Sequence, residues 1–291
     1  MVKKMEKINY KVKSSSGVML DVKYYKAEIS KGILQICHGM QEHKERYDNF
    51  AKFLVDNGYD VLIHDHLGHG KSINEEHPLG DLVSAKNLIE DIDMVRQSVD
   101  VKGSYFILGH SMGSFLARIY SSRQKVDRLI ACGTGQPSTI KAKLLKGILL
   151  TQKRDIPLDS IQRLVMNPME KEFDNPMDWI SINKKDQIEY ENDPLCGKSF
   201  TRSGYKSLMD IVLTLNNDDT FKNCSANKIL LISGERDPLG NFTKDILKIE
   251  KRYKEEGKDV KTIFYENMSH EILNEVENQK VYNDILDFLK S

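Results

Sequence analysis

The fold is decided by the stretch YFILGHSMG, which runs from Tyr105 to Gly113. Its first four residues form a short apolar run, which predicts a buried strand. From Met112 to Tyr120 the apolar residues recur at helical spacing, so a helix is expected to follow directly. Between the two lies the pattern G-x-S-x-G, and in this strand–turn–helix setting it predicts a sharp turn that presents Ser111.

The two glycines of this turn serve its chemistry. Gly109 and Gly113 lack a β-carbon, so the strand and the helix can pass close to Ser111. The N-terminus of the helix supplies unpaired N–H groups and a positive potential beside the serine. We therefore predict that Ser111 is a nucleophile held in strained backbone geometry.

Outward from this turn, short apolar runs alternate with amphipathic segments. The runs predict strands at 33–37, 59–63, 105–108, 126–132, 229–233 and 260–265, and the segments predict helices at 46–57, 83–99, 112–120, 242–255 and 281–289. Residues 8–12 and 18–24 flank a turn-like stretch and predict an opening hairpin. Such alternation is typical of an α/β protein with a mostly parallel central sheet that is covered on both faces.

The alternation stops between residues 134 and 216. This part has no clear strand, several helical pieces and a scatter of methionines among many charges. We predict that residues 134–216 are an inserted helical cap on one α/β core, which is made of residues 1–133 and 217–291. A chain of 291 residues is long enough for one large domain with such an insertion.

A neutral serine hydroxyl needs a base, usually a histidine that is held by a carboxylate. After a turn of this kind, the acid and then the histidine follow later strands. Of the eight histidines only His270 comes after Ser111, and it stands just behind a predicted strand. The loop after the preceding predicted strand contains Glu235 and Asp237. We prefer Asp237, which a neighbouring proline makes rigid, and keep Glu235 as the alternative.

When Ser111 attacks a carbonyl group, the carbonyl oxygen becomes negatively charged and needs two hydrogen-bond donors. The second is expected from the loop after an early strand, and the stretch HGMQEH, from His38 to His43, occupies that place. We expect the backbone N–H groups of Met40 and Met112 to form the pair.

The composition argues against several classes of function. Lysine plus arginine equals aspartate plus glutamate, 43 against 43, so no global field gathers nucleic acid or an anionic membrane. A local basic patch at Lys141, Lys143 and Lys146 stays open. Nowhere do about 18 apolar residues run together, and residues 1–7 lack the apolar stretch of a secretory signal. The four cysteines show no metal or redox spacing, which favours reduced thiols in a cytoplasmic protein.

Two further patterns are set aside. The stretch HDHLGH, residues 64–69, suggests a metal cluster, but Gly68 stands where a binuclear metal loop has an aspartate. The stretch GHGKS, residues 68–72, lacks the first glycine of a phosphate-binding loop, because Asp65 takes that place. We expect no metal and no cofactor, and we expect this loop to shape the floor or rim of the site.

A set of short motifs spans nearly the whole chain: His38-Gly39, Glu42-His43, Arg46-Tyr47, Asp65, Gly68-His69-Gly70, Ser72, Gly109 to Gly113, Asp193 to Cys196, Asp237-Pro238 and His270 to Glu275. Together they resemble the α/β-hydrolase superfamily, and more closely its monoacylglycerol lipase and bacterial lysophospholipase group. Ser269 departs from the resemblance, because bacterial relatives often carry a basic residue there.

The resemblance implies that Ser111, Asp237 and His270 form a catalytic triad and that Met40 and Met112 are the oxyanion donors. It also implies a helical cap over an apolar acyl tunnel, and no cofactor. The implied reaction is hydrolysis of monoacylglycerol or lysophospholipid-like esters through an acyl-enzyme.

Alternatives stay open at this point. A serine aminopeptidase of the proline-iminopeptidase kind is favoured by acidic residues of the cap, namely Glu170, Glu172, Asp174 and Asp178. A thioesterase or a carbon–carbon hydrolase uses the same triad, and a non-catalytic binding protein is expected to have lost one of its members. The leucine-rich stretch 144–150 predicts at most transient contact with a membrane or micelle, unless its leucines pack on the core. The sequence does not determine the acyl chain length or the head group of the substrate, or the oligomeric state of the protein.

Overall fold

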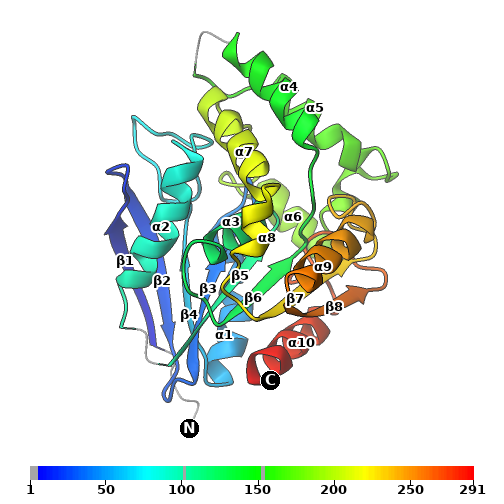
Figure 1. Ribbon diagram of the computed structural model, residues 1–291. Helices are drawn as coiled ribbons and strands as arrows, with labels where there is room; N and C mark the ends of the chain where they lie inside the picture. Colours follow the sequence, from blue (N-terminus) through cyan, green and yellow to red (C-terminus); the bar gives the residue numbers. More distant parts are fainter. Residues whose placement is uncertain (1–5, 101–102, 152–154) are drawn as a thin grey trace.

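The computed structural model describes residues 6–100, 103–151 and 155–291. Its centre is an eight-stranded sheet in the order β1-β2-β4-β3-β5-β6-β7-β8 (Figure 1). The strands are β1 (Glu6–Lys13), β2 (Met19–Lys26), β3 (Gly32–Cys37), β4 (Asp60–His64), β5 (Ser104–His110), β6 (Arg128–Cys132), β7 (Lys228–Gly234) and β8 (Asp259–Tyr265). β2 pairs antiparallel with β1 and β4, and all other neighbours pair in parallel. The predicted hairpin and mostly parallel sheet are confirmed, although residues 1–5 of the expected N-terminal segment lie outside the described residues.

Helices cover both faces of this sheet. One face carries α1 (Asp48–Asp56) and α10 (Asn278–Lys290), and the other carries α2 (Ala85–Gln97), α3 (Met112–Ser121), α8 (Asp218–Lys222) and α9 (Lys244–Glu255). In β5, Tyr105 and Ile107 pack into one core while Phe106 and Leu108 pack into the other. Because successive side chains of a strand point to opposite faces, a strand covered on both faces is apolar at every position.

Four predicted helices begin at other residues than their patterns indicate, and two of them show a change of conformation there. The segment predicted as a helix from residue 46 starts with a short 3-10 helix, η1 (Lys44–Tyr47), before α1. The segment predicted from residue 242 becomes helical only at Lys244. Asn241, Phe242 and Thr243 have φ values of 50°, 50° and 74°, and a run of left-handed residues cannot continue a right-handed helix.

Helices also fill the segment between β6 and β7. They are α4 (Thr139–Leu150), α5 (Asp159–Glu170), η2 (Pro176–Trp179), α6 (Lys184–Asn192) and α7 (Arg202–Leu215). In Figure 1, α4 and α5 lie at the end of the molecule opposite the N-terminus. α7 packs against α2, α3 and α4 and so joins this segment to the core. The limits of the cap at 134 and 216 stay a prediction. In the described ranges, no helix has both the length and the apolar character that crossing a bilayer requires.

Candidate active site

Ser111 occupies the turn between β5 and α3. Its φ of 53° and ψ of −123° are costly for a residue with a β-carbon. A β-carbon at Gly109 would overlap the carbonyl of Gly113, and one at Gly113 would overlap the carbonyls of Cys37 and His38. These two glycines therefore allow β3, β5 and α3 to meet beside the serine.

A histidine and a carboxylate come to the same place from two later loops. His270 follows β8 and lines one cavity with Ser111, and Asp237 follows β7. Nδ1 of His270 lies 2.9 Å from Oδ2 of Asp237, and both side chains are buried. Oδ1 of Asp237 accepts the N–H of Leu239 at 2.9 Å. Glu235, the alternative acid, is exposed. With its Nδ1 proton directed at Asp237, His270 keeps Nε2 free to accept a proton.

Two backbone N–H groups beside Ser111 are unused. They belong to Met40, in the loop after β3, and to Met112, the first residue of α3. Neither N–H donates to an acceptor within the described ranges. The Met40 loop passes close to the serine, since a β-carbon at Gly39 would lie 3.0 Å from the Cβ of Ser111. Free donors in this position suit a developing oxyanion.

Buried side chains hold the Met40 loop on both sides. Oε1 of Glu42 accepts the N–H of Gly39 at 2.5 Å. Nε2 of His69 accepts the N–H of Gln41, whose φ is 61°, at 3.2 Å. The residues before and after Met40 are thus tied down, while its own N–H stays free.

His69 belongs to a cluster of four buried rings under this loop, together with His38, His64 and His66. The centroids of neighbouring rings in the cluster are 4.3 to 6.4 Å apart. Burial lowers the pKa of all four, to about 4 for His64 and for His69. The rings are therefore neutral near pH 7, and the stretch HDHLGH forms a packed floor beneath the Met40 loop.

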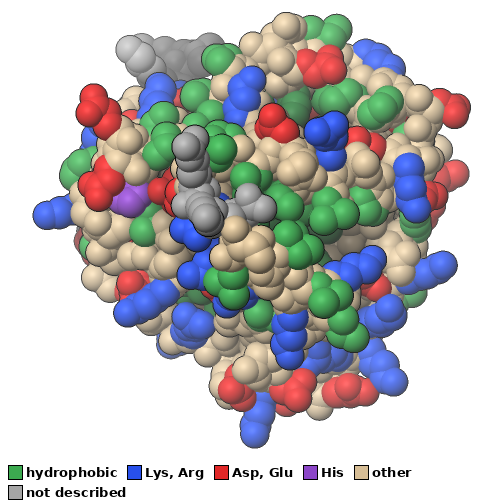
Figure 2. Space-filling view, turned by 90° about the horizontal axis from the view of Figure 1, so that it is seen from above, with side chains coloured by type: hydrophobic (Ala, Val, Ile, Leu, Met, Phe, Trp, Pro, Cys, Tyr) green, Lys and Arg blue, Asp and Glu red, His purple; other side chains and the backbone are tan. Residues whose placement is uncertain are grey.

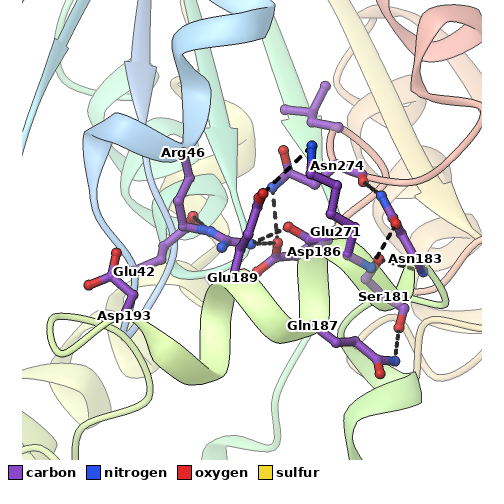
Figure 3. Close-up of polar contacts among 12 residues, drawn as sticks. Glu42, Arg46, Ser181, Asn183, Asp186, Gln187, Glu189, Asp193, Glu271 and Asn274 are labelled. Carbon is purple, nitrogen blue, oxygen red and sulfur yellow. Dashed lines mark hydrogen bonds and ion pairs between the residues drawn. The ribbon is translucent and has the colours of Figure 1, made fainter.

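Arg46 on η1, whose side chain is 8% exposed, contacts three carboxylates from three parts of the chain (Figure 3). It pairs with Glu271, next to His270, lies 3.0 Å from Asp186 on α6, and reaches Oε2 of Glu42 at 3.5 Å. Burial, followed by the negative charge of Glu271, raises the pKa of Asp186 to about 8. Asp186 therefore holds its proton to a higher pH than a free carboxyl does, and the cluster joins the core, the histidine loop and the cap.

His110, inside the G-x-S-x-G pattern, connects the two loops of the site. Its Nδ1 donates to Glu42 at 3.0 Å and its Nε2 to the carbonyl of His270 at 3.3 Å. Burial alone would lower the pKa of His110, but the hydrogen bond and charge of Glu42 raise it. The same bond lowers the pKa of Glu42 to about 2 against the effect of burial. Sequence reasoning missed this role, because the pattern leaves the position before Ser111 unrestricted.

The cavity beside Ser111 is small and is lined from both the core and the cap. Its volume is about 30 Å³, which is room for roughly two water molecules. The cap contributes Met166, Trp179 and Tyr190, and the ring of Trp179 lies 5.2 Å from that of His270. An acyl chain does not fit into this volume. The apolar tunnel that the resemblance implies is therefore not formed by this cavity.

A possible metal-ligand group lies at the contact between core and cap. Ligand atoms of His43, Asp193 and Cys196 come within 4.8 Å of one another. However, Nε2 of His43 lies 2.8 Å from Asp193, and its Nδ1 accepts the N–H of Glu45. The imidazole proton therefore sits between His43 and Asp193, where a metal would have to bind. Burial also raises the pKa of the Cys196 thiol, so a hydrogen-bonded contact is the better description.

The acidic cap residues that favoured an aminopeptidase take no part in the cavity beside Ser111. None of Glu170, Glu172, Asp174 and Asp178 lines the cavity. Asp178 pairs with Lys184 at 2.7 Å, and Glu172 and Asp174 are exposed. The carboxylates that do line the cavity, Glu42 and Glu271, are already paired with cations.

A parallel sheet with a strained serine at one turn and a histidine bonded to a buried aspartate defines a hydrolase of the α/β-hydrolase class. A family model described as serine aminopeptidase, S33, matches residues 28–277. The chain belongs to this family. Membership establishes the fold and the class of enzyme, while the bond that is cleaved has to be argued from the site.

Several individual relatives are lipases or esterases. The human monoglyceride lipase is 26% identical over 213 residues, which are 69% of this chain and 63% of that protein. The monoacylglycerol lipase of Mycolicibacterium smegmatis is 23% identical and covers 90% of this chain and 89% of its own length. The crystal structure of a thermostable carboxyl esterase from Bacillus coagulans, in complex with glycerol, is 26% identical with a TM-score of 0.90 over 99% of both chains. The chain spans less than two thirds of the length of the human, rat and mouse monoglyceride lipases.

Proposed function

We propose that this protein is a serine carboxylic-ester hydrolase that acts on monoacylglycerol or lysophospholipid-like esters. One observation carries the proposal: a strained Ser111 shares a small cavity with His270, which is bonded to the buried Asp237. In this proposal these three residues are the triad, and Met40 and Met112 are the oxyanion donors. The similarity to monoacylglycerol lipases and to a carboxyl esterase supports ester substrates over amides.

The reaction follows from these positions. Nε2 of His270 takes the hydroxyl proton of Ser111 while Oγ bonds to the ester carbonyl carbon. The carbonyl oxygen becomes negative and accepts the N–H groups of Met40 and Met112, each contributing about 3 kcal/mol. The bond to the alcohol oxygen breaks as His270 returns the proton to it. Water then attacks the acyl-serine, gives a proton to His270, and the acid leaves as Ser111 regains its proton.

The lining of the cavity supports a hydroxylated alcohol group. Tyr190 brings a hydroxyl group to the lining of the cavity, whereas Met166 and Trp179 bring apolar surface. The related carboxyl esterase holds glycerol in its crystal structure, which agrees with an acylglycerol substrate here. The acyl chain would then follow the apolar cap side once the cap has moved.

One face of α4 supports transient contact with a lipid surface. Ile140, Leu144 and Ile148 are 72%, 65% and 47% exposed, and their spacing of four residues places them on one face of the helix. Leu145 and Leu149 are buried against the core, so only part of this stretch packs inward. Figure 2 looks onto this end of the molecule, where apolar side chains lie among charged side chains of both signs. Such a surface fits the boundary of a micelle or bilayer.

We also propose that the protein works in the cytoplasm. Cys37, Cys132, Cys196 and Cys224 are all free and buried, which agrees with a compartment that keeps thiols reduced. The oligomeric state is left open.

The proposed function is tested with a series of monoacylglycerols and matching lysophospholipids, with Ser111→Ala as the control. We expect release of fatty acid by the wild type and none by the variant. Preference for one head group over the other separates the two substrate classes. Thioesters and aminoacyl amides in the same assay test the rival activities, and cleavage of these alone would contradict the proposal.

A further inference from the structure

Backbone hydrogen bonds attach the loop that carries His270 to the cap. The N–H of His270 donates to the carbonyl of Trp179 at 3.1 Å. The N–H of Glu271 donates to the carbonyl of Ile180 at 2.7 Å. Two successive residues of the histidine loop therefore depend on two successive residues of the cap.

Side chains fasten the same junction. The hydroxyl of the buried Ser269 donates to the carbonyl of Asp178 at 2.6 Å. Oε1 of Glu275 accepts two N–H groups, that of Ser269 at 3.1 Å and that of Ile182 at 3.0 Å. One carboxylate oxygen thus joins the residue before His270 to the cap.

Glu275 has no place in the reaction described above. It is 2% exposed and does not line the cavity of Ser111. Burial raises the pKa of Glu275, and the N–H groups that it accepts from Ile182 and Ser269 oppose this rise. A buried carboxylate is unfavourable unless its hydrogen bonds compensate for lost water. Here those bonds connect the histidine loop to the cap.

We propose that Glu275 is a positioning residue: through Ser269 and Ile182 it makes the His270 loop and the adjacent cap segment one unit. His270 then keeps its place between Ser111 and Asp237 only while this junction is intact. The inference rests on the proposed function of these three residues.

The junction also divides the cap. Residues 178–183 stay with the histidine loop, and Asn183 adds a bond of 2.8 Å from its Nδ2 to the carbonyl of Asn274 (Figure 3). The movement that admits an acyl chain must therefore come from other parts of the cap. Met166 on α5 lines the cavity and lies outside this junction.

The test compares Glu275→Ala with Glu275→Gln. Glu275→Ala removes the hydrogen bonds from the N–H groups of Ser269 and Ile182. We expect His270 to be displaced as a result, which should lower kcat roughly 10- to 100-fold with little change in KM. The rate at which a fluorophosphonate probe labels Ser111 should fall by the same factor, because that reaction also needs His270. The glutamine variant keeps an oxygen for both N–H groups and should recover most of the rate.

Asp91→Ala is the matched control. Asp91 is 1% exposed and likewise accepts a backbone N–H, from Ser15, as well as the hydroxyl of Ser14. It lies on α2, outside the cavity lining. Its removal should lower Tm as Glu275→Ala does and leave the labelling rate unchanged.

Each outcome decides the inference. A wild-type labelling rate in Glu275→Ala, or an equal loss in Asp91→Ala, overturns it. If Glu275→Ala does not fold, Ser269→Ala must show a smaller but selective loss of labelling, and a wild-type rate there overturns the inference as well. A wild-type protein that is labelled at Ser111 but cleaves no ester overturns the proposed function instead, and the labelling rates still decide the role of Glu275.

Discussion

The half of the site that carries Ser111 and the half that carries His270 are held by different parts of the molecule. Ser111 and Met40 follow β5 and β3, whose side chains are buried on both faces, and packed histidine rings support the Met40 loop from below. His270 instead sits on a loop bonded to the cap by backbone groups, by Glu275 and by the Arg46 cluster.

Because of this difference, the stability of the core and the correct placement of His270 depend on different sets of contacts. Ser111 and Met112 are placed by the same packing that forms the sheet. The base depends on an inserted segment, which the proposed function requires to move before an acyl chain can enter. Changes in the cap are therefore expected to alter the His270 loop, and also the Met40 loop, whose Gln41 is bonded to Gly197 and Lys198 of the cap, while Ser111 itself remains in place.

The largest effect is expected from Asp237→Asn, which breaks the His270 half at its centre. An amide at this position no longer holds the Nδ1 proton of His270, so Nε2 loses its role as acceptor. By analogy with serine proteases, kcat should fall about 10⁴-fold. Fatty-acid release by a variant with unchanged circular dichroism measures this. A fall of less than tenfold would show that another group orients His270.

A second prediction concerns Arg46→Met, which removes the cation between the cap and the histidine loop. Glu271 and Asp186 would be left buried without their partner, and unfolding should become about 3 to 5 kcal/mol easier. Urea unfolding measures the change. The exposed pair of Lys254 with Glu250 provides a control, since Lys254→Met should change stability by less than about 1 kcal/mol. Equal losses in both variants would contradict a buried junction.

The third prediction uses pH on the same cluster. The pKa of Asp186 is raised from 3.8 to about 8, so the folded protein holds a proton that the unfolded chain releases. Its contribution to stability is complete below the unfolded pKa and is lost as the pH rises through the folded pKa. Asp186→Asn removes this loss, so its Tm relative to the wild type should rise by about 2 °C or more between pH 5 and pH 8. A constant difference across that range would place the pKa of Asp186 near its ordinary value.

The smallest effect on the chemistry is expected from Leu144→Ser with Ile148→Ser on α4. Both side chains are exposed and lie outside the cavity lining, so hydrolysis of a short, water-soluble ester should not change. Binding to phospholipid vesicles should weaken roughly tenfold, because apolar surface is lost from the contact. Leu247→Ser on α9, which is 51% exposed in the wild type, serves as the control. Equal vesicle binding by all three proteins would remove α4 from the proposal.

The parts of the molecule that follow from local pattern could be predicted. A run such as Tyr105 to Leu108 is apolar because both faces of its strand are covered, and that signal lies within four residues. Local patterns also predict the turn at Ser111, from G-x-S-x-G, and the position of His270, from the apolar run that precedes it. The structure brings His270 and Asp237 within 2.9 Å, while their catalytic roles remain to be tested.

Contacts between distant segments could not be predicted. Arg46, Asp186 and Glu271 are ordinary charged residues in sequence, and nothing in their spacing shows that they meet. Glu275 is similar, because its two N–H partners come from loops that are 87 residues apart, at Ile182 and Ser269. A residue's type shows what it can bond to, and only the fold shows which partner is within reach.

The central claim is that Ser111 carries the acyl group during ester hydrolysis. The most direct test is rapid acid quenching of the enzyme during turnover of a monoacylglycerol, followed by mass measurement of the intact protein and of its Ser111 peptide. We predict a transient mass increase equal to one acyl group on that peptide, absent from Ser111→Ala. Ester hydrolysis without an adduct, or with the adduct on another residue, would contradict the account.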